Sequence, residues 1–362
     1  MITGWEKKEQ ICSMLADEQS KEIYRLRCKY YDTKDITCFH EIIDKYVPEY
    51  RDEKYYDKKE LLLEEVIRQS KYTVMFGAGA RGMQLLNTLS AKDISVEILV
   101  DNSTEAIGTT VAGFCVQSPV DIDVDKVDCV VVTPHGTKVM ESIREQLLAM
   151  GIAEEKIYFY RHYIFSGLEK QYFEDEIIEY NDYEFFVDAG SLNLGTSLEF
   201  IERAKNAGTK TAKVVAFEPN REAFADCNRI AGMHNEEDIT IYNAGLWSRD
   251  TRLHFIEGST GDSRVSDEET ELSIDVMALD LHVKEPVTFI KMDIEGAEME
   301  ALKGCANIIK KDKPKLAICI YHKQEDLIDI PLYVKELVPE YKLYVRHYSN
   351  CNSETVLYAV LD

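Results

Sequence analysis

Short apolar runs alternate with helix-like segments in two successive parts of this sequence, and this alternation limits the folds that the chain can adopt. Between residues 72 and 163 the apolar runs are YTVMF, SVEILVDN, DCVVVT and IYFY, and helix-like segments follow the first and third runs. From Asp182 onward the pattern repeats on a larger scale. Buried apolar strands that alternate with amphipathic helices form parallel sheets with crossover connections. We therefore predict an α/β protein with two parallel-sheet domains.

The length of 362 residues, of which 45% are apolar, allows two or three packed domains. We predict a helical N-terminal segment over residues 1–70, a small α/β domain over 71–165, a helix-like connector over 166–182 and a larger α/β domain over 183–362. The larger domain contains these strand-like runs: EFFVDAG, KVVAFEP, DITIYNAGL, TRLHFIEG, VTFIKMDIEG, PKLAICIYH, YKLYVRHYS and ETVLYAVLD.

The charge balance excludes several classes of partner. The chain has 42 Lys and Arg against 66 Asp and Glu, a formal net charge of −24. Because such an acidic surface repels phosphate backbones and anionic lipids, we expect neither nucleic acid nor a membrane as a partner. The longest uncharged stretch, residues 106–120, is shorter than the roughly 20 apolar residues of a membrane helix. The N-terminal MITGWEKKEQ is charged where a signal peptide needs an apolar run, which predicts a cytoplasmic protein.

The nine cysteines form no CxxC pair and lie mostly inside apolar runs, as is typical of reduced thiols in a protein core. No Cys and His spacing indicates a zinc site. The sequence gives no indication of the oligomeric state.

A complete GxGxxG motif, formed by Gly77, Gly79 and Gly82, directly follows the first apolar run. Asp101 ends the next run, 19 residues after Gly82, which is close to the spacing of a ribose-binding carboxylate. The glycines allow backbone N–H groups to approach a pyrophosphate at a helix N-terminus. We predict a Rossmann-like domain that binds a nucleotide or a nucleotide-sugar. The alternative is a tight turn without a ligand, in which Asp101 is a turn carboxylate.

A second loop, DAGSLNLGTS, also follows an apolar run but begins with the carboxylate of Asp188. A carboxylate at this point would repel a pyrophosphate and attract a cation, and S-adenosylmethionine carries an ammonium and a sulfonium but no phosphate. Glu218 ends the next run and can accept hydrogen bonds from two ribose hydroxyls. Helix capping is the alternative role of each acid alone. We predict a cofactor site formed by Asp188, Gly190, Ser191, Glu218 and Asn220.

Three carboxylates, those of Asp293, Glu295 and Glu298, lie within six residues directly after the run FIKM. Carboxylates that cluster near a ligand crevice shift one another's pKa values, which marks a candidate functional site. The alternative for Glu298 is that it caps the helix that follows.

Residues 183–362 resemble FkbM-type S-adenosylmethionine-dependent methyltransferases. The resemblance is carried by the blocks FVDAG with GTS, AFEPN, NAGL, FIKMDIEGAEMEALKG, KPKLAICIYHKQEDLIDIPLYV, YVRHYS and ETVLYAV. The family loop usually reads close to DVGANIG, whereas here the loop from Ser191 to Gly195 is one residue longer. The middle domain more weakly resembles the small Rossmann-like domain of sugar-modifying acetyltransferases, through its GxGxxG loop and its VDN motif.

The resemblance implies a seven-strand class I methyltransferase sheet, with Asp188, Gly190 and Glu218 in contact with the cofactor and Asp293 beside the transferred methyl group. It also implies O-methylation of a hydroxyl group on a small molecule such as a sugar or natural product, or on a glycan.

Methyl transfer to a hydroxyl group requires an in-line approach and benefits from a general base. The candidate catalytic residues are Asp293, Glu295 and His322, which ends the run KLAICIY. For His322 the alternative is a hydrogen-bonded residue at the end of a strand. A hard cation at Asp293 and Glu295 would have suitable oxygen ligands, but no third ligand is evident, so we predict no metal site.

Two other functions are considered. A NAD(P)-dependent oxidoreductase that uses the GxGxxG domain would leave Asp188 and Glu218 without a role. A non-catalytic nucleotide-sugar-binding protein with a degenerate methyltransferase half would explain the longer loop at 191–195, but the retained carboxylates of Asp188, Glu218, Asp293 and Glu298 argue against it.

Overall fold

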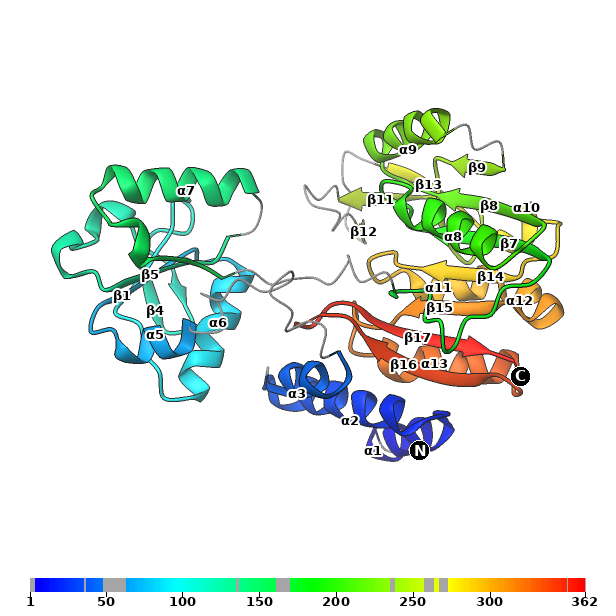
Figure 1. Ribbon diagram of the computed structural model, residues 1–362, viewed down its shortest axis with the longest axis horizontal. Helices are drawn as coiled ribbons and strands as arrows, with labels where there is room; N and C mark the ends of the chain where they lie inside the picture. The colour runs from blue at the N-terminus through cyan, green and yellow to red at the C-terminus, as the bar shows by residue number, and fades with distance from the viewer. Residues whose placement is uncertain are drawn as a thin grey trace. The chain divides into compact units, whose positions relative to one another are not determined.

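The computed structural model describes residues 4–35, 37–47, 63–134, 137–160, 170–234, 238–256, 264–266, 273–349 and 351–361. Contacts divide the chain into two compact units (Figure 1). Unit 1 comprises Met1–Asp32 and Ile164–Asp362, and unit 2 comprises Thr33–Tyr163. The predicted N-terminal segment 1–70 is thus shared between both units, and its charged run 51–60 lies outside the described residues.

Unit 2 is built around a sheet with the strand order β3-β4-β2-β1-β5-β6. Pairing is parallel except between β3 and β4. The central strands TVMF and CVVV are wholly buried, and their side chains enter two separate apolar clusters on opposite faces. Its elements are α3 (Thr37–Tyr46), α5 (Leu63–Gln69), β1 (Thr73–Phe76), α6 (Ala80–Ala91), β2 (Ile98–Val100), β3 (Thr110–Val111), β4 (Phe114–Gln117), β5 (Cys129–Val132), α7 (Thr137–Ala149) and β6 (Ile157–Phe159).

Unit 1 contains a sheet that, in the described part of the chain, has seven strands in the order β16-β17-β15-β14-β7-β8-β9. Neighbouring strands are parallel except that β17 is antiparallel to both β15 and β16. Figure 1 shows α8 packed on this sheet. The strands are β7 (Tyr183–Ala189), β8 (Thr211–Phe217), β9 (Ile239–Tyr242), β14 (Phe289–Met292), β15 (Lys315–Cys319), β16 (Lys342–His347) and β17 (Thr355–Val360).

The helices of unit 1 connect these strands or precede them. They are α1 (Gly4–Met14), α2 (Glu18–Thr33), α8 (Gly195–Asn206), α9 (Arg221–His234), α10 (Leu279–His282), α11 (Glu298–Gly304), α12 (Ala306–Asp312) and α13 (Asp326–Leu337). Both units are therefore mixed α/β with mainly parallel sheets, as predicted.

A second, smaller sheet of unit 1 takes up part of the predicted strands. Its order is β10-β13-β11-β12, and β11 is antiparallel to both of its neighbours. The run DITIYNAGL is divided between the two sheets, and TRLHFIEG contributes β11 to the smaller one. The bounds are β10 (Gly245–Leu246), β11 (Thr251–Ile256), β12 (Arg264–Ser266) and β13 (Ser273–Met277). Strands β12 and β13 were not predicted from the sequence.

The predicted helix-like connector is not a helix where the structure describes it. Residues 170–181 form turns, in which the amides of Ile177 and Ile178 both donate to the carbonyl of Glu174, at 2.9 and 2.7 Å. Phe173 is buried against Phe186, Phe200 and Phe289 of the unit 1 core. Apolar burial on the sheet therefore determines the path of this segment, despite its helix-like composition.

The N-terminal helices pack on the C-terminal strands of unit 1. The amide of Ala16 donates to the carbonyl of Leu343 at 2.8 Å, and Ser20 Oγ accepts from the amide of Val345 at 2.9 Å. Arg346, whose side chain is 6% exposed, donates to both carboxylate oxygens of Asp17, at 2.8 and 3.4 Å. These bonds join α2 to β16.

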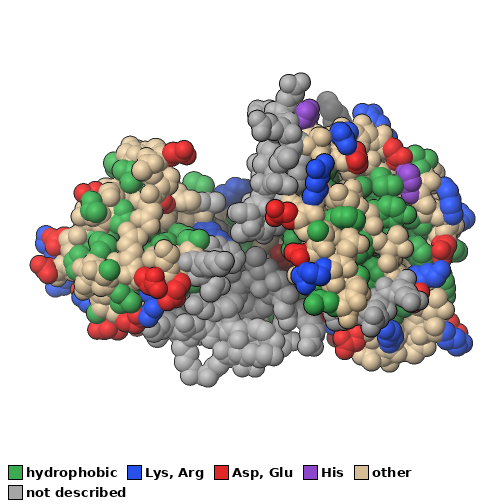
Figure 2. Space-filling model, turned by 90° about the horizontal axis from the view of Figure 1, so that it is seen from above, with side chains coloured by type: hydrophobic (Ala, Val, Ile, Leu, Met, Phe, Trp, Pro, Cys, Tyr) green, Lys and Arg blue, Asp and Glu red, His purple; other side chains and the backbone are tan. Residues whose placement is uncertain are grey.

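Among the described residues, no helix is long and apolar enough to cross a membrane. Figure 2 shows Lys and Arg side chains interspersed with Asp and Glu on the face of unit 1 that it presents.

We predict that Asp17→Asn lowers the free energy of unfolding by about 2 kcal/mol, because it removes a charged hydrogen-bond acceptor from a buried guanidinium. Burial would raise the pKa of Asp17, but the hydrogen bonds from Arg346 and Ser20 outweigh it and lower that pKa. This contribution is therefore present above the carboxyl's ordinary pKa and is lost as the pH falls through the lowered value. Urea unfolding at pH 7 and at acid pH measures both effects.

The matched control is Asp32→Asn, because Asp32 pairs with Lys8 and is 57% exposed. This variant should change stability by less than about 0.5 kcal/mol. Equal effects of the two substitutions would contradict the role assigned to the Asp17–Arg346 pair.

Candidate functional site

A buried ion pair lies where the central strands of the unit 1 sheet end. Lys291 of β14 and Asp188 of β7 are register partners, and Lys291 Nζ lies 3.1 Å from Asp188 Oδ1. Their side chains are 3% and 0% exposed. Asp188 Oδ2 accepts a second hydrogen bond from Ser197 of α8 at 2.7 Å. Burial would lower the pKa of Lys291, but the charges of Asp188 and Asp293 outweigh it and raise that pKa.

The same ammonium group holds the loop that follows β7. Lys291 Nζ donates to the carbonyls of Ala189 and Gly190, at 3.2 and 2.7 Å. Gly190 has a φ of 80°, and a Cβ there would lie 2.0 Å from the carbonyl oxygen of Asp293. Glycine is required at this position because the end of β14 approaches its backbone. Gly190 therefore packs against the backbone of Asp293. The Asp188 carboxylate is buried and binds Lys291, so it is not exposed at the sheet edge.

Glu218, directly after β8, holds the other side of this loop. Its side chain accepts from the amides of Leu192 and Asn220, at 2.8 and 2.9 Å, through different oxygens. The residue is 6% exposed. Burial raises its pKa, although the two backbone hydrogen bonds act in the opposite direction. Each oxygen keeps capacity for a further hydrogen bond, because a carboxylate has about four acceptor sites.

Two of the predicted cofactor residues have local partners. Ser191 is 3% exposed, and its hydroxyl lies 3.7 Å from the thiol of Cys227. Asn220 Oδ1 accepts from the amide of Ala223 at the start of α9, which is a helix-capping bond. The longer loop has left-handed backbone at Leu192 and Leu194, with φ of 46° and 63°. Leu194 is completely buried, so its packing stabilises a conformation that is costly for a non-glycine residue.

Asp293 follows β14 and lies at the centre of a hydrogen-bonded group. Tyr172 donates to its Oδ2 at 2.7 Å, and Tyr321 donates to its Oδ1 at 3.0 Å. Burial would raise the pKa of Asp293, but the charges of Lys291 and His322 and the two tyrosine hydrogen bonds hold it below its usual range. Asp293 is thus an ionised carboxylate that keeps 24% of its side chain exposed.

His322 lies among three carboxylates. Its Nδ1 is 2.9 Å from Glu298 Oε1, and its Nε2 is 3.5 Å from Asp293 and 3.4 Å from Glu295. Burial would lower the pKa of His322, but these carboxylates, Glu298 first, raise it to about 9. The imidazole therefore carries a proton at neutral pH, a state in which it can donate a proton but cannot accept one.

The local field around this group is negative. Burial and the charge of Glu298 raise the pKa of Asp326 to about 7. Burial and the charge of Asp293 raise the pKa of Glu354 to about 7 as well. Glu354 accepts a hydrogen bond from Gln171, next to Tyr172. Acidic groups that hold protons near neutrality indicate that negative charge is in excess here.

The structure brings together the three predicted catalytic residues Asp293, Glu295 and His322. Lys291, Tyr172 and Tyr321 hold the site in place and were not predicted from the sequence. A signal for Lys291 was present, because it is the one charged residue inside the buried strand FIKM. Tyr172 carried no such signal, since its segment lies more than 100 residues from Asp293 in the chain.

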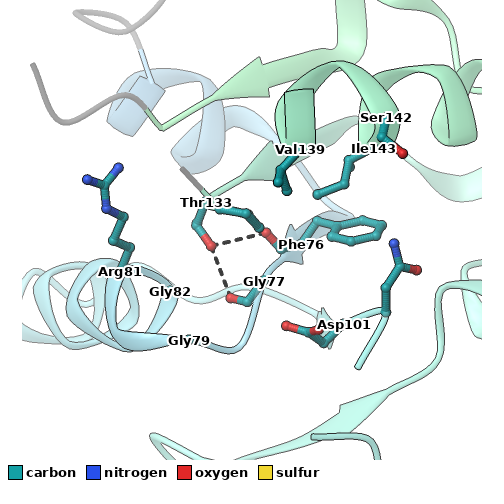
Figure 3. Close-up of a pocket in the computed structure, with 12 residues that line it drawn as sticks. Phe76, Gly77, Gly79, Arg81, Gly82, Asp101, Thr133, Val139, Ser142 and Ile143 are labelled. Atoms are coloured by element: carbon teal, nitrogen blue, oxygen red, sulfur yellow. Dashed lines mark hydrogen bonds between the residues drawn. The ribbon is translucent and has the colours of Figure 1, made fainter. Parts of the chain in front are cut away.

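In unit 2, the GxGxxG loop lines a cavity of ≈ 610 Å³ (Figure 3). A Cβ at Gly82 would lie 1.9 Å from the carbonyl oxygen of Gly77, and Gly77 itself has a φ of 114°. These two glycines are required by the turn alone. Thr133 donates to the carbonyls of Phe76 and Gly77, at 3.1 and 3.0 Å, and fixes the loop from the neighbouring strand.

Gly79 differs from the other two glycines. A Cβ at Gly79 would have no neighbour within 4 Å, and its φ of −72° suits any residue. Asp101 also lines the cavity, and its two oxygens accept from the amides of Ala78 and Ser103, at 2.7 and 2.8 Å. Asp101 is thus a turn carboxylate, as in the alternative above. The other lining residues include Arg81, Asn102, Pro134, Val139, Ser142 and Ile143.

Two family models match parts of this chain. Residues 187–345 match the family model of the methyltransferase FkbM domain, which confirms the predicted resemblance over this range. Residues 69–158 match the model described as C2185-like, N-terminal. "Methyltransferase 1" of the fungus Beauveria bassiana (strain ARSEF 2860) is 26% identical over 168 residues. The match spans 38% of this chain and 66% of that protein, just under two thirds of its length.

Two solved structures are also similar. Methyltransferase FkbM from Methylobacillus flagellatus KT is 22% identical with a TM-score of 0.47, over 82% of this chain and 92% of that one. Fibrillarin from Aeropyrum pernix, in complex with natively bound S-adenosyl-L-methionine, is 11% identical with a TM-score of 0.29, over 49% of this chain and 66% of that one.

We predict that Lys291→Met lowers the free energy of unfolding by about 3–5 kcal/mol, because it leaves the buried Asp188 carboxylate without its counter-charge. Urea unfolding followed by circular dichroism measures this change. The double variant Asp188→Asn with Lys291→Met should recover part of the loss, since it removes the uncompensated charge. If the single variant is as stable as the wild type, Lys291 does not have the role assigned here.

Proposed function

We propose that this chain, whose residues 187–345 match the methyltransferase FkbM domain, is an S-adenosylmethionine-dependent methyltransferase. Its acceptor would be a hydroxyl group of a small molecule such as a sugar or natural product, or of a glycan. The observation that carries the proposal is the alignment of Glu218, Gly190 and Asp293 along the carboxyl ends of β8, β7 and β14. Open α/β sheets bind their ligands at this edge. The order of the seven strands, with β17 antiparallel, supports the class I sheet that the resemblance implies.

The residues at this edge suit the cofactor chemically. Glu218 is fixed by two backbone N–H groups and keeps acceptor capacity for ribose hydroxyls. Asp293 is ionised, and its negative charge suits a cationic cofactor. Asp188 would act indirectly, by holding Lys291 and through it the backbone of Gly190. S-adenosylmethionine supplies an electrophilic methyl group when it is bound.

Asp293 is the group best placed to orient the acceptor. Two tyrosine hydroxyls fix its carboxylate, and its exposed part can accept a hydrogen bond from an incoming hydroxyl group. Such orientation contributes much of the acceleration in a displacement reaction. His322 carries a proton at neutral pH, so in that state it would position Asp293 and the acceptor instead of acting as the base.

For unit 2 we propose a second function, in which its cavity binds a nucleotide or nucleotide-sugar. The observation that carries this proposal is the open space around Gly79. Neither the turn nor a neighbouring side chain requires glycine there. A glycine without such a local need allows a phosphate to approach the backbone at the start of α6.

We expect wild-type protein to bind S-adenosylmethionine with one site per chain in a calorimetric titration. Glu218→Ala should weaken binding at least tenfold, about 1.4 kcal/mol, because it removes the ribose acceptor and the clamp on Leu192. The matched control is Glu222→Ala, an exposed residue in the first turn of α9, which should bind as the wild type does. Wild-type protein that fails to bind the cofactor would overturn the proposal.

For unit 2, we expect binding of a nucleotide-sugar or of NAD(H) by the wild type and its loss in Gly79→Val. The thermal midpoint of this variant should stay near the wild-type value, since no atom lies near the added side chain. Gly82→Ala should instead destabilise unit 2 through its clash with the Gly77 carbonyl. If Gly79→Val binds both ligands as the wild type does, this second proposal is wrong.

A further inference from the structure

Asp293, Glu298 and His322 converge at one point, although they come from three different elements. Asp293 follows β14, Glu298 begins α11 and His322 follows β15. One potential ligand atom of each residue lies within 4.8 Å of those of the other two. Carboxylate oxygens and histidine nitrogens bind divalent metals at about 2.0–2.2 Å, so two ligands of one ion lie at most about 4.4 Å apart. That limit holds for ligands on opposite sides of an ion, and ligands at tetrahedral or right angles lie closer, so side-chain shifts of about 1 Å would bring the three groups around one ion.

Buried atoms of this group have no hydrogen-bond partner. Glu298 has no exposed surface, and its Oε1 accepts from the amide of Ile294 at 3.0 Å. Among the described residues, its Oε2 and both ring nitrogens of His322 lack a partner with hydrogen-bond geometry. His322 is 8% exposed. Since nearly all buried polar atoms in native proteins are satisfied, these atoms indicate a ligand that they bind together.

The charges of the group also favour a cation. Three carboxylates, those of Asp293, Glu295 and Glu298, surround one imidazole. The neighbouring ammonium groups are already held, Lys291 by Asp188 and Lys323 by the carbonyl of Gly296. Asp293 and Glu295 keep 24% and 33% of their side chains exposed, so an ion can enter from solvent.

We propose that Asp293, Glu298 and His322 bind one divalent metal ion. Two carboxylates with one imidazole favour Mn²⁺ or Zn²⁺, because Mg²⁺ and Ca²⁺ prefer ligands that are all oxygen. Three protein ligands leave further coordination positions for water or for an acceptor hydroxyl group. Resting on the methyltransferase function proposed above, the metal would bind that hydroxyl group and lower its pKa, and the released proton would pass to solvent water. A metal binds an imidazole only through a nitrogen that carries no proton, so metal binding would displace a proton from His322.

The test is equilibrium dialysis of the full-length chain, freed of metal with a chelator, against Mn²⁺ and separately against Zn²⁺. We expect one tightly bound ion per chain for at least one of the two metals. His322→Gln and Asp293→Asn should each weaken binding at least tenfold. His282→Gln is the matched control, because His282 also pairs with a carboxylate, that of Asp250, but lies partly exposed on the surface. This control should bind as the wild type does.

Metal binding and cofactor binding are measured on the same samples. Circular dichroism verifies that each variant is folded, and Glu298→Gln, which keeps an acceptor for the Ile294 amide, replaces any variant that is not. Wild-type protein that binds neither metal, or folded His322→Gln that binds as the wild type does, overturns the metal site even if S-adenosylmethionine binds. Metal that binds through these residues while S-adenosylmethionine does not supports the site and counts against the methyltransferase function.

Discussion

The ion pair between Lys291 and Asp188 is the interaction on which the candidate site of unit 1 depends. It joins two adjacent parallel strands at their carboxyl ends, where the sheet stops and the loops begin. The same ammonium group binds the carbonyls of Ala189, the last residue of β7, and of Gly190, so one charge contacts both the neighbouring strand and the loop that follows it. Gly190 can then lie against the carbonyl of Asp293, which links the cofactor-side loop directly to the proposed acceptor side.

This arrangement concentrates negative charge at one edge of the sheet. Asp293, Glu295 and Glu298 all follow β14 within a few residues, and Glu354 reaches the same region from the β16–β17 connection. Burying like charges together is unfavourable unless cations or protons offset them. A proton on His322 and the raised pKa values of Asp326 and Glu354 offset part of this negative charge. The negative charge at this edge favours the binding of a cation.

Sequence patterns predicted the strands and the loops at their ends, because apolar periodicity and strand-end carboxylates are local signals. The prediction that Asp188 attracts a cation was chemically sound, but the cation is Lys291 of the same chain, more than 100 residues away. Glu298 was expected to cap the helix that follows it, and nothing in the local sequence indicated that it lies beside His322. Such juxtapositions depend on how β14 and β15 pair, and no single stretch of sequence encodes that pairing. The path of residues 173–180 was misjudged for a related reason, since burial of Phe173 outweighed helix propensity.

The packing of the N-terminal helices on β16 has a consequence for how the chain folds during synthesis. Residues 17 and 20 are translated more than 300 residues before their partners at 345 and 346. Unit 2 is continuous in sequence and can fold as soon as its last strand has emerged. Unit 1 closes only after β16 and β17 have been translated. Until then, the buried faces of α1 and α2 lack their native cover, and apolar surface that is exposed in this way promotes aggregation of a nascent chain.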